Sequence, residues 1–342
     1  MVIVDVSELD SKIIKDGIIF VGASKSTLAL QRFKKLQEFA CENYFNAIWF
    51  EKRDGIARIL WIIRLFFLSV IYRNRTWVCH GSYWPELVVL IIFGVKYSLI
   101  VQGSELYIDG PLRRKLHCWI LNNSLSVGCR TIEQKNLVSG LAASASPFVL
   151  RMDDYAPPVG TDGSQRSYTI SVRASAPLYR QEYALTIAKK VNDSCENELK
   201  TLYICYNGPD QDPENDLSDE KIHGPIDQLS LAKLLSDAQF VVSVPRTDGL
   251  SNVVIEALIQ GALIICSEAT LKDEFEEYRE RFIVVPEEIL DVPEALTKFL
   301  EIELKKHDLS SVSRQDLLAI HQKFSFDSSS LQTLIGWKNS NV

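Results

Sequence analysis

Short apolar runs alternate with longer amphipathic stretches along the whole chain. In the first half, runs of strand length occur at 17–21, 47–50, 76–79, 97–101 and 125–129. Helical spacing follows at 27–42 and 56–72, and Pro85 opens a further helix, since proline favours the first helical position. Strands that alternate with helices are typical of parallel α/β layers. We take the run 125–129 as the last strand of this half.

A segment rich in proline, glycine and polar residues, 151–168, is typical of a linker to a second α/β half. Strands are predicted there at 169–172, 202–206, 240–244 and 262–266, and helices at 182–191 and 230–238. The tail, from about residue 315, has a helical pattern. A chain of 342 residues is long enough for two domains that each bury a core. We therefore predict domains 1–155 and 156–320 and a C-terminal helix within 321–342.

Charge is distributed unevenly between the two halves. Residues 1–150 hold 18 Lys and Arg against 12 Asp and Glu, a net charge of +6. The remaining residues hold 19 against 32, a net charge of −13. A basic half in a protein of net charge −7 indicates an anionic partner for that half. The acidic run 209–220 lacks the pattern of a calcium loop and is predicted to be a solvated loop.

The apolar helix 56–72 is accompanied by four arginines, Arg58, Arg64, Arg73 and Arg75. Basic side chains beside apolar ones suit an anionic membrane surface, and the alternative is a core helix with basic ends. The run is shorter than the about 20 apolar residues of a spanning helix, so we expect no span. Seven scattered cysteines without a C-x-x-C pair, and a start without a basic signal region, indicate a cytoplasmic protein.

The segment 248–256, Asp-Gly-Leu-Ser-Asn-Val-Val-Ile-Glu, lies between two of the apolar runs. It predicts a glycine turn followed by a helix that begins near Ser251 or Asn252. A helix start offers unpaired N–H groups and the positive end of a dipole, which suit a phosphate. Asp248 and Glu256, on either side, can accept hydrogen bonds from sugar hydroxyls. The segment is therefore suited to a nucleotide-sugar.

The stretch 241–267 resembles the donor-binding signature of retaining GT-B glycosyltransferases of the family 4 type. That signature has two acidic residues separated by seven others, then a small residue, a hydrophobic residue and a glycine before a buried strand. These places are taken by Asp248, Glu256, Ala257, Leu258 and Gly261. The chain departs at Asp248, where the family usually has glutamate. The resemblance implies two Rossmann-like α/β domains facing across a cleft, with a last helix that can cross back to the first domain.

The resemblance also implies a set of donor-binding residues. Arg173 matches a family arginine that faces the diphosphate, and Arg180 stands loosely for a lysine. Arginine binds phosphate through a planar fork of donors, although both could be ordinary surface residues. Glu256 would bind the ribose and Asp248 the sugar hydroxyls. The remaining donor-binding residues are Asn207, Gly208 and Gly224 for the base and ribose, and Gly249, Leu250, Ser251 and Asn252 for the diphosphate.

On the acceptor side, the loop Gly103, Ser104 and Glu105 is similar to a family loop near the reacting sugar, with Gln102 where histidine often stands. His80 closes another predicted strand of the first half. It would carry a proton, or else it is a satisfied structural residue at a strand end. The acceptor-side residues are thus His80 and the loop 103–105.

The implied activity is retaining transfer of a hexose-type sugar from a nucleotide-diphosphate-sugar to a glycan or polyprenyl-linked glycan in surface polysaccharide biosynthesis, with Asp248, Glu256 and Arg173 as catalytic residues. The place of work would be the cytoplasm or the inner face of the membrane. No D-x-D motif has a strand context, so we expect no metal cofactor, and we expect no nucleic-acid partner. Two alternatives are an inactive glycan-binding or scaffold protein, favoured by Asp248 and Gln102, and an enzyme that epimerises or hydrolyses the sugar-nucleotide.

Overall fold

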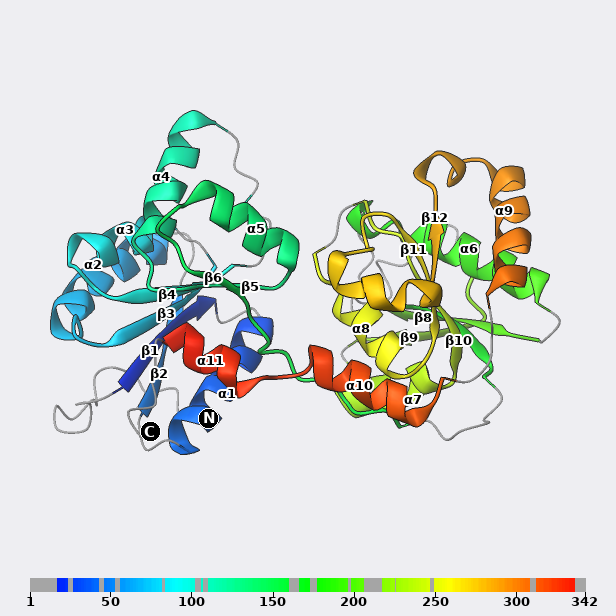
Figure 1. Cartoon of the computed structure of the whole chain (residues 1–342), viewed down its shortest axis with the longest axis horizontal. Helices are drawn as coiled ribbons and strands as arrows, with labels where there is room; N and C mark the ends of the chain where they lie inside the picture. The colour runs from blue at the N-terminus through cyan, green and yellow to red at the C-terminus, as the bar shows by residue number, and fades with distance from the viewer. Residues whose placement is uncertain are drawn as a thin grey trace. The chain divides into compact units, whose positions relative to one another are not determined.

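The computed structural model describes residues 17–335 except 24–26, 43–45, 53–55, 82–83, 102–105, 107–109, 160–165, 173–176, 196–197, 206–216, 225, 247–248 and 308–311. The chain forms two compact units (Figure 1). Unit 1 comprises Met1–Asp153 and Phe326–Val342, and unit 2 comprises Asp154–Ser325. The chain therefore passes between the units twice, once after Asp153 and again after Ser325.

Unit 1 is built on a six-stranded parallel sheet with the strand order β2-β1-β3-β4-β5-β6. Its strands are β1 (Gly17–Ala23), β2 (Asn46–Lys52), β3 (Thr76–His80), β4 (Tyr97–Ile100), β5 (Val127–Cys129) and β6 (Pro147–Val149). The prediction that 125–129 is the last strand of this half is wrong, because β6 follows it and pairs with β5. β6 is only three residues long and begins with proline, a residue that is uncommon inside sheets. Its sequence therefore has too few apolar positions to predict a strand.

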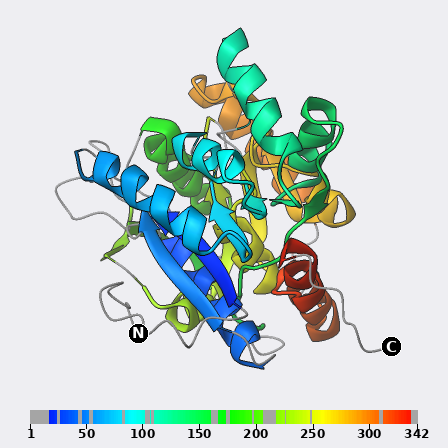
Figure 2. The same ribbon diagram turned by 90° about the vertical axis from the view of Figure 1, so that its left-hand side faces the viewer.

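Helices cover both faces of this sheet (Figures 1 and 2). One face carries α1 (Thr27–Glu42) and α11 (Ser328–Ile335), and the other carries α2 (Ile56–Ile71), α3 (Trp84–Ile92), α4 (Pro111–Asn122) and α5 (Ile132–Leu141). Alternate residues of a strand point to opposite faces, so Ile18 and Phe20 pack in the α1–α11 layer and Ile19 in the α2–α5 layer. Among the described helices, none has both the length and the apolar character needed to cross a membrane.

The predicted helical tail consists of two helices that belong to different units. α10 (Arg314–Phe324) is part of unit 2, and α11 is part of unit 1. Leu331 and Leu334 of α11 are fully buried in the same cluster as Phe20. The Ser126 hydroxyl donates a hydrogen bond to the Leu334 carbonyl at 2.9 Å. α11 is therefore an integral part of the core of unit 1.

Unit 2 also contains a six-stranded parallel sheet, with the order β12-β11-β10-β7-β8-β9. Its strands are β7 (Tyr168–Val172), β8 (Lys200–Cys205), β9 (Glu220–His223), β10 (Ala238–Ser243), β11 (Leu263–Ser267) and β12 (Phe282–Val285). α6 (Gln181–Ser194) and α9 (Pro293–Lys306) cover one face, and α7 (Gln228–Ser236), α8 (Asn252–Ile259) and α10 cover the other. Short 3-10 helices lie at Pro177–Tyr179, Asp273–Arg281 and Glu287–Ile289. Residue 220 of the predicted acidic loop begins β9 instead.

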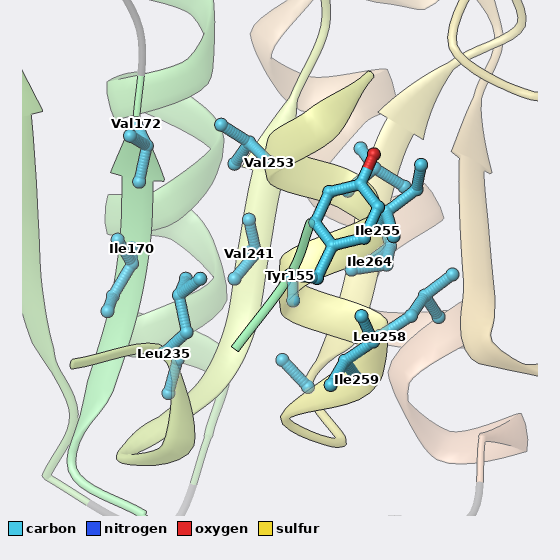
Figure 3. Close-up of a cluster of buried hydrophobic side chains, with 14 of the residues drawn as sticks. Tyr155, Ile170, Val172, Leu235, Val241, Val253, Ile255, Leu258, Ile259 and Ile264 are labelled. Carbon is cyan, nitrogen blue, oxygen red and sulfur yellow. The ribbon is translucent and has the colours of Figure 1, made fainter. Parts of the chain in front are cut away.

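The core beneath α8 holds this helix firmly on the sheet (Figure 3). Almost every residue of α8 is buried, namely Val253, Val254, Ile255, Ala257, Leu258 and Ile259. They pack with Ile170 and Val241 of the sheet and with Tyr155 from the segment before β7. Burying an aliphatic side chain contributes about 1.5–3 kcal/mol, so this packing strongly disfavours movement of α8. The two polar residues of the helix, Asn252 and Glu256, are positioned by it.

Candidate functional site

The carboxyl ends of all strands of unit 2 meet at one edge of the sheet, because the strands are parallel. The chain runs outward from β7 through β8 to β9, and then returns to form β10 on the other side of β7. The strand order therefore reverses between β7 and β10. Open α/β sheets bind ligands at the carboxyl edge beside such a reversal. The loops after β7 and β10 accordingly define the candidate ligand site of unit 2.

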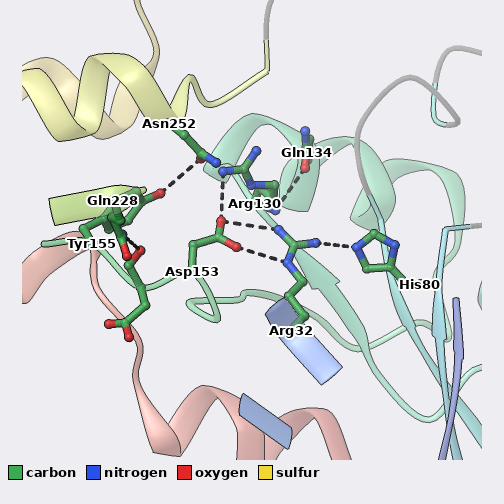
Figure 4. A network of polar contacts seen from close by, with 9 residues as sticks. Arg32, His80, Arg130, Gln134, Asp153, Tyr155, Gln228 and Asn252 are labelled. Atoms are coloured by element: carbon green, nitrogen blue, oxygen red, sulfur yellow. Dashed lines mark hydrogen bonds and ion pairs between the residues drawn. The ribbon is translucent and has the colours of Figure 1, made fainter. Parts of the chain in front are cut away.

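The loop after β10 leads directly into α8. The helix begins at Asn252 with Ser251 as its N-cap, so the predicted start is confirmed. Leu250 and Ser251 are buried, whereas a side chain added at Gly249 would meet no atom within 4 Å. The Tyr155 hydroxyl donates a hydrogen bond to Oδ1 of Asn252 at 3.2 Å (Figure 4). The start of α8, with its outward N–H groups, is thus held at the carboxyl edge of the sheet.

Glu256 lies one helical turn after Asn252 on the same face of α8, since residues four apart are neighbours on a helix. Its side chain is half-buried, and burial raises the pKa of this carboxyl to about 7. No other residue in the described part of the chain hydrogen-bonds its carboxylate. A half-buried acid without a protein partner, one turn from a helix start, is suited to a ligand that donates hydroxyl groups.

Arg180 lies at the start of α6, beyond the loop that follows β7. Its backbone has the left-handed φ of 50°, which is costly for a residue with a side chain. Its guanidinium pairs with Glu287, and this hydrogen bond is the main cause of its raised pKa. Its Nη1 atom is buried without a hydrogen-bond partner among the residues that the structure describes. One donor of Arg180 is therefore available to an anion while Glu287 holds another.

The structure adds Arg246, which the sequence analysis did not single out. It follows β10, is exposed, and its N–H donates to the Leu178 carbonyl at 2.9 Å. Its charge contributes to the lowered pKa of Glu287, which arises first from the hydrogen bond with Arg180. The available signal was a basic residue directly after a predicted strand, two positions before Asp248. Two arginines and Glu287 thus lie together at this edge.

Of the other residues predicted to bind the donor, the structure describes Gly224. Gly224 follows β9 with a φ of +91°, and its N–H donates to the Cys205 carbonyl at 2.9 Å. This places Gly224 at the same carboxyl edge as the start of α8. The predicted site residues outside the described part of the chain are Arg173, Asn207, Gly208, Asp248, Gly103, Ser104 and Glu105.

In unit 1, a buried polar cluster lies at the end of β3 and at the last residue of the unit's first segment (Figure 4). Arg32 bonds Asp153 through Nε to Oδ1 at 3.2 Å, and its Nη1 donates to Nε2 of His80 at 3.0 Å. Arg130 donates to Oδ2 of Asp153 at 2.9 Å. Arg32 of α1 therefore bonds both His80 of β3 and Asp153, and Asp153 also binds Arg130, which follows β5.

The electrostatics of this cluster determine the charge of His80. Burial, and then the nearby charge of Arg32, lower the pKa of His80 to about 3, so the imidazole is neutral near pH 7. Burial opposes ionisation of Asp153, but Arg32 and Arg130 outweigh it and hold the pKa of that carboxyl below its ordinary range. His80 is 1 % exposed. Its burial and its bond to Arg32 favour the structural alternative of the sequence analysis over a proton carrier.

Comparison with solved structures matches this architecture to the GT-B fold. Neither a protein-family model nor a curated protein sequence matches the chain. A solved glycosyltransferase from Rickettsia africae matches with a TM-score of 0.69 at 10 % identity, covering 96 % of this chain and 100 % of that one. The sucrose-phosphate synthase of Thermosynechococcus elongatus matches with a TM-score of 0.63 at 12 % identity, covering 93 % and 97 %.

HepE from Anabaena, solved in complex with UDP-glucose, matches with a TM-score of 0.60 at 12 % identity, covering 93 % of this chain and 98 % of that one. At such identities the likeness establishes the fold. The predicted fold class, α/β with two Rossmann-like domains of the GT-B type, is confirmed.

Proposed function

We propose that the protein is a retaining glycosyltransferase that moves a hexose-type sugar from a nucleotide-diphosphate-sugar to a glycan or lipid-linked glycan. The observation that carries the proposal is the carboxylate of Glu256. It has no partner in the described structure and lies one turn after the start of α8, at the reversal of strand order. The GT-B fold and its UDP-glucose-bound relative from Anabaena support the same donor class.

In this proposal unit 2 binds the donor. The ribose hydroxyls donate to Glu256, and the N–H groups from Gly249 to Asn252 bind the diphosphate. Arg180, through its available Nη1, balances part of the charge that grows on the departing diphosphate. Arg173 would act beside it, and Asp248 would bind the hydroxyls of the transferred sugar. The base would lie near Gly224, Asn207 and Gly208.

Transfer then requires no side-chain nucleophile. The bond between the anomeric carbon and the phosphate oxygen breaks as the acceptor hydroxyl attacks the same face of the sugar. The proton of that hydroxyl passes to the departing phosphate oxygen. Because attack and departure take place on the same face, the configuration at the anomeric carbon is retained. The loop Gly103, Ser104 and Glu105 would position the acceptor, and no metal is assigned a role. The setting we propose is surface polysaccharide biosynthesis at the cytoplasmic face of a membrane.

Binding and turnover with a panel of nucleotide-diphosphate-sugars test the proposal. Saturable binding of one donor is expected, with nucleoside diphosphate released only when a glycan acceptor is present. Release of a free sugar or formation of an epimer without acceptor would identify a hydrolase or epimerase. Binding of glycan without donor turnover under any acceptor condition would identify an inactive scaffold protein.

The pH dependence of donor binding follows from the pKa of Glu256. A protonated carboxyl accepts hydrogen bonds from two ribose hydroxyls less well than a carboxylate does. At about pH 7, half of the Glu256 side chains are protonated. Donor affinity should therefore rise from pH 6 to pH 8, being about tenfold weaker at pH 6 than at its plateau. Isothermal titration calorimetry measures this, and Glu256→Gln should remove the dependence. A wild-type affinity that is flat across this range would contradict the role of Glu256.

A further inference from the structure

The outward face of α2 is apolar although it is exposed. Trp61, Leu65 and Leu68 of this helix are buried in the core of unit 1. Residues on the opposite side, three and four positions apart, form one exposed row: Ile63 at 52 %, Phe66 at 46 %, Phe67 at 61 % and Val70 at 49 %. A helix that is apolar on all sides is normally buried on all sides. The outer row of α2 therefore indicates an external apolar partner.

The apolar row continues onto the neighbouring helix α3, which packs against α2. The rings of Phe66 and Phe93 meet edge to face with centroids 4.5 Å apart, and Ile92 is 68 % exposed. We call the exposed apolar residues of α2 and α3 the apolar face of unit 1: Ile63, Phe66, Phe67, Val70, Ile71 and Ile92.

The exposed charged residues that the structure describes between 56 and 101 are all basic, namely Arg64, Arg73 and Lys96. Between residues 56 and 101 the sequence contains one carboxylate, Glu86, and this side chain is 3 % exposed and therefore buried. An apolar centre flanked by basic residues, with no exposed acid in the described part of 56–101, matches the boundary of an anionic lipid bilayer, where phosphate groups surround acyl chains.

We propose that the apolar face of unit 1 docks on an anionic membrane, with Phe67 and Ile63 inserted at the acyl boundary and the basic residues on lipid phosphates. A second copy of the chain is a poorer occupant, because a two-fold contact through this face would bring like charges together. The proposal goes beyond the glycosyltransferase function and does not depend on it, since docking is measured without donor or acceptor. It concerns a surface and not a spanning segment.

Co-flotation of the full chain with vesicles tests the proposal. Vesicles of phosphatidylcholine with about one third phosphatidylglycerol should bind the protein, and pure phosphatidylcholine should bind it far more weakly. Binding should weaken as salt shortens the Debye length from about 10 Å. The double variant Ile63→Ser, Phe67→Ser should lose about tenfold or more in affinity, since two apolar side chains no longer insert. Arg64→Gln, Arg73→Gln, Lys96→Gln should lose about fivefold for each charge removed.

Matched controls lie on unit 2. Ile302 is on helix α9 with 46 % exposure, so Ile302→Ser removes an exposed apolar residue elsewhere. Lys233→Gln, Lys298→Gln, Lys305→Gln removes the same number of exposed charges. Both controls should bind vesicles like the wild type. Equal binding by the α2 variants and the controls would overturn the proposal. So would a wild-type dimer in light scattering that Ile63→Ser, Phe67→Ser converts to a monomer without any vesicle binding.

Discussion

Asparagine in place of Asp153 is expected to lower the free energy of unfolding of unit 1 by about 3–5 kcal/mol, as removal of one partner from a buried ion cluster does. Arg32 and Arg130 both bind this carboxylate, and their side chains are 2 % and 13 % exposed. The amide keeps the shape of the side chain but leaves two largely buried positive charges unbalanced. The pKa of Asp153 is lowered from 3.8, so the stabilisation is present at neutral pH and is lost only as acid protonates the carboxylate.

Urea unfolding followed by tryptophan fluorescence measures this effect in unit 1 alone. The six tryptophans all belong to that unit: Trp49, Trp61, Trp77, Trp84, Trp119 and Trp337. Glu38→Gln is the control in the same unit, because its side chain is 64 % exposed in a surface pair with Lys35, and it should change the free energy by no more than about 1 kcal/mol. Equal urea midpoints for the two variants would show that the cluster contributes nothing to stability.

The second large effect is expected at the proposed donor site. Glu256→Gln and Arg173→Ala should each reduce sugar transfer about tenfold or more, because a lost charged hydrogen bond costs about 1.5–3 kcal/mol. Glu256→Gln keeps the size of the side chain within buried α8, so the fold should be retained. The measurement is the specificity constant for donor turnover together with donor affinity. Glu301→Gln, an exposed change on helix α9, serves as the control and should leave both unchanged.

Wild-type donor affinity and turnover in both Glu256→Gln and Arg173→Ala would remove the donor-site assignment while leaving the GT-B fold untouched. Loss of turnover with donor affinity kept would instead assign these two residues to the transition state. In either case the vesicle binding of unit 1 is measured separately and is unaffected.

Much of the fold could be predicted because buried parallel strands are continuous apolar runs. The runs at 17–21, 76–79 and 262–266 coincide with β1, β3 and β11 within a few residues. β6, β9 and β12 were missed, since a strand of three or four residues has too few positions for a pattern. The split of the tail into α10 and α11 was also missed, because it is determined by which unit each helix packs on.

The site was predictable where it depends on adjacent residues and not where it depends on distant ones. The start of α8 follows from a glycine turn before a short apolar helix, all within one segment. The pair of Arg180 with Glu287 joins residues 107 positions apart, and the bond of Arg32 to Asp153 spans 121 positions. Such pairs arise from tertiary packing, which periodicity does not encode. The roles of Asp248 and Arg173 stay predictions.

The place of α11 in unit 1 has a bearing on how the chain is made. Unit 2 can be completed on the ribosome before unit 1, because Phe326–Val342, which supplies α11, is synthesised after unit 2. Until Leu331 and Leu334 emerge, Ile18 and Phe20 lack part of their apolar cover. Most chains of several domains fold from the N-terminal domain onward. Here unit 1, whose first segment precedes unit 2 in the sequence, is completed only by a helix that follows unit 2, so part of its sheet stays uncovered during synthesis of unit 2.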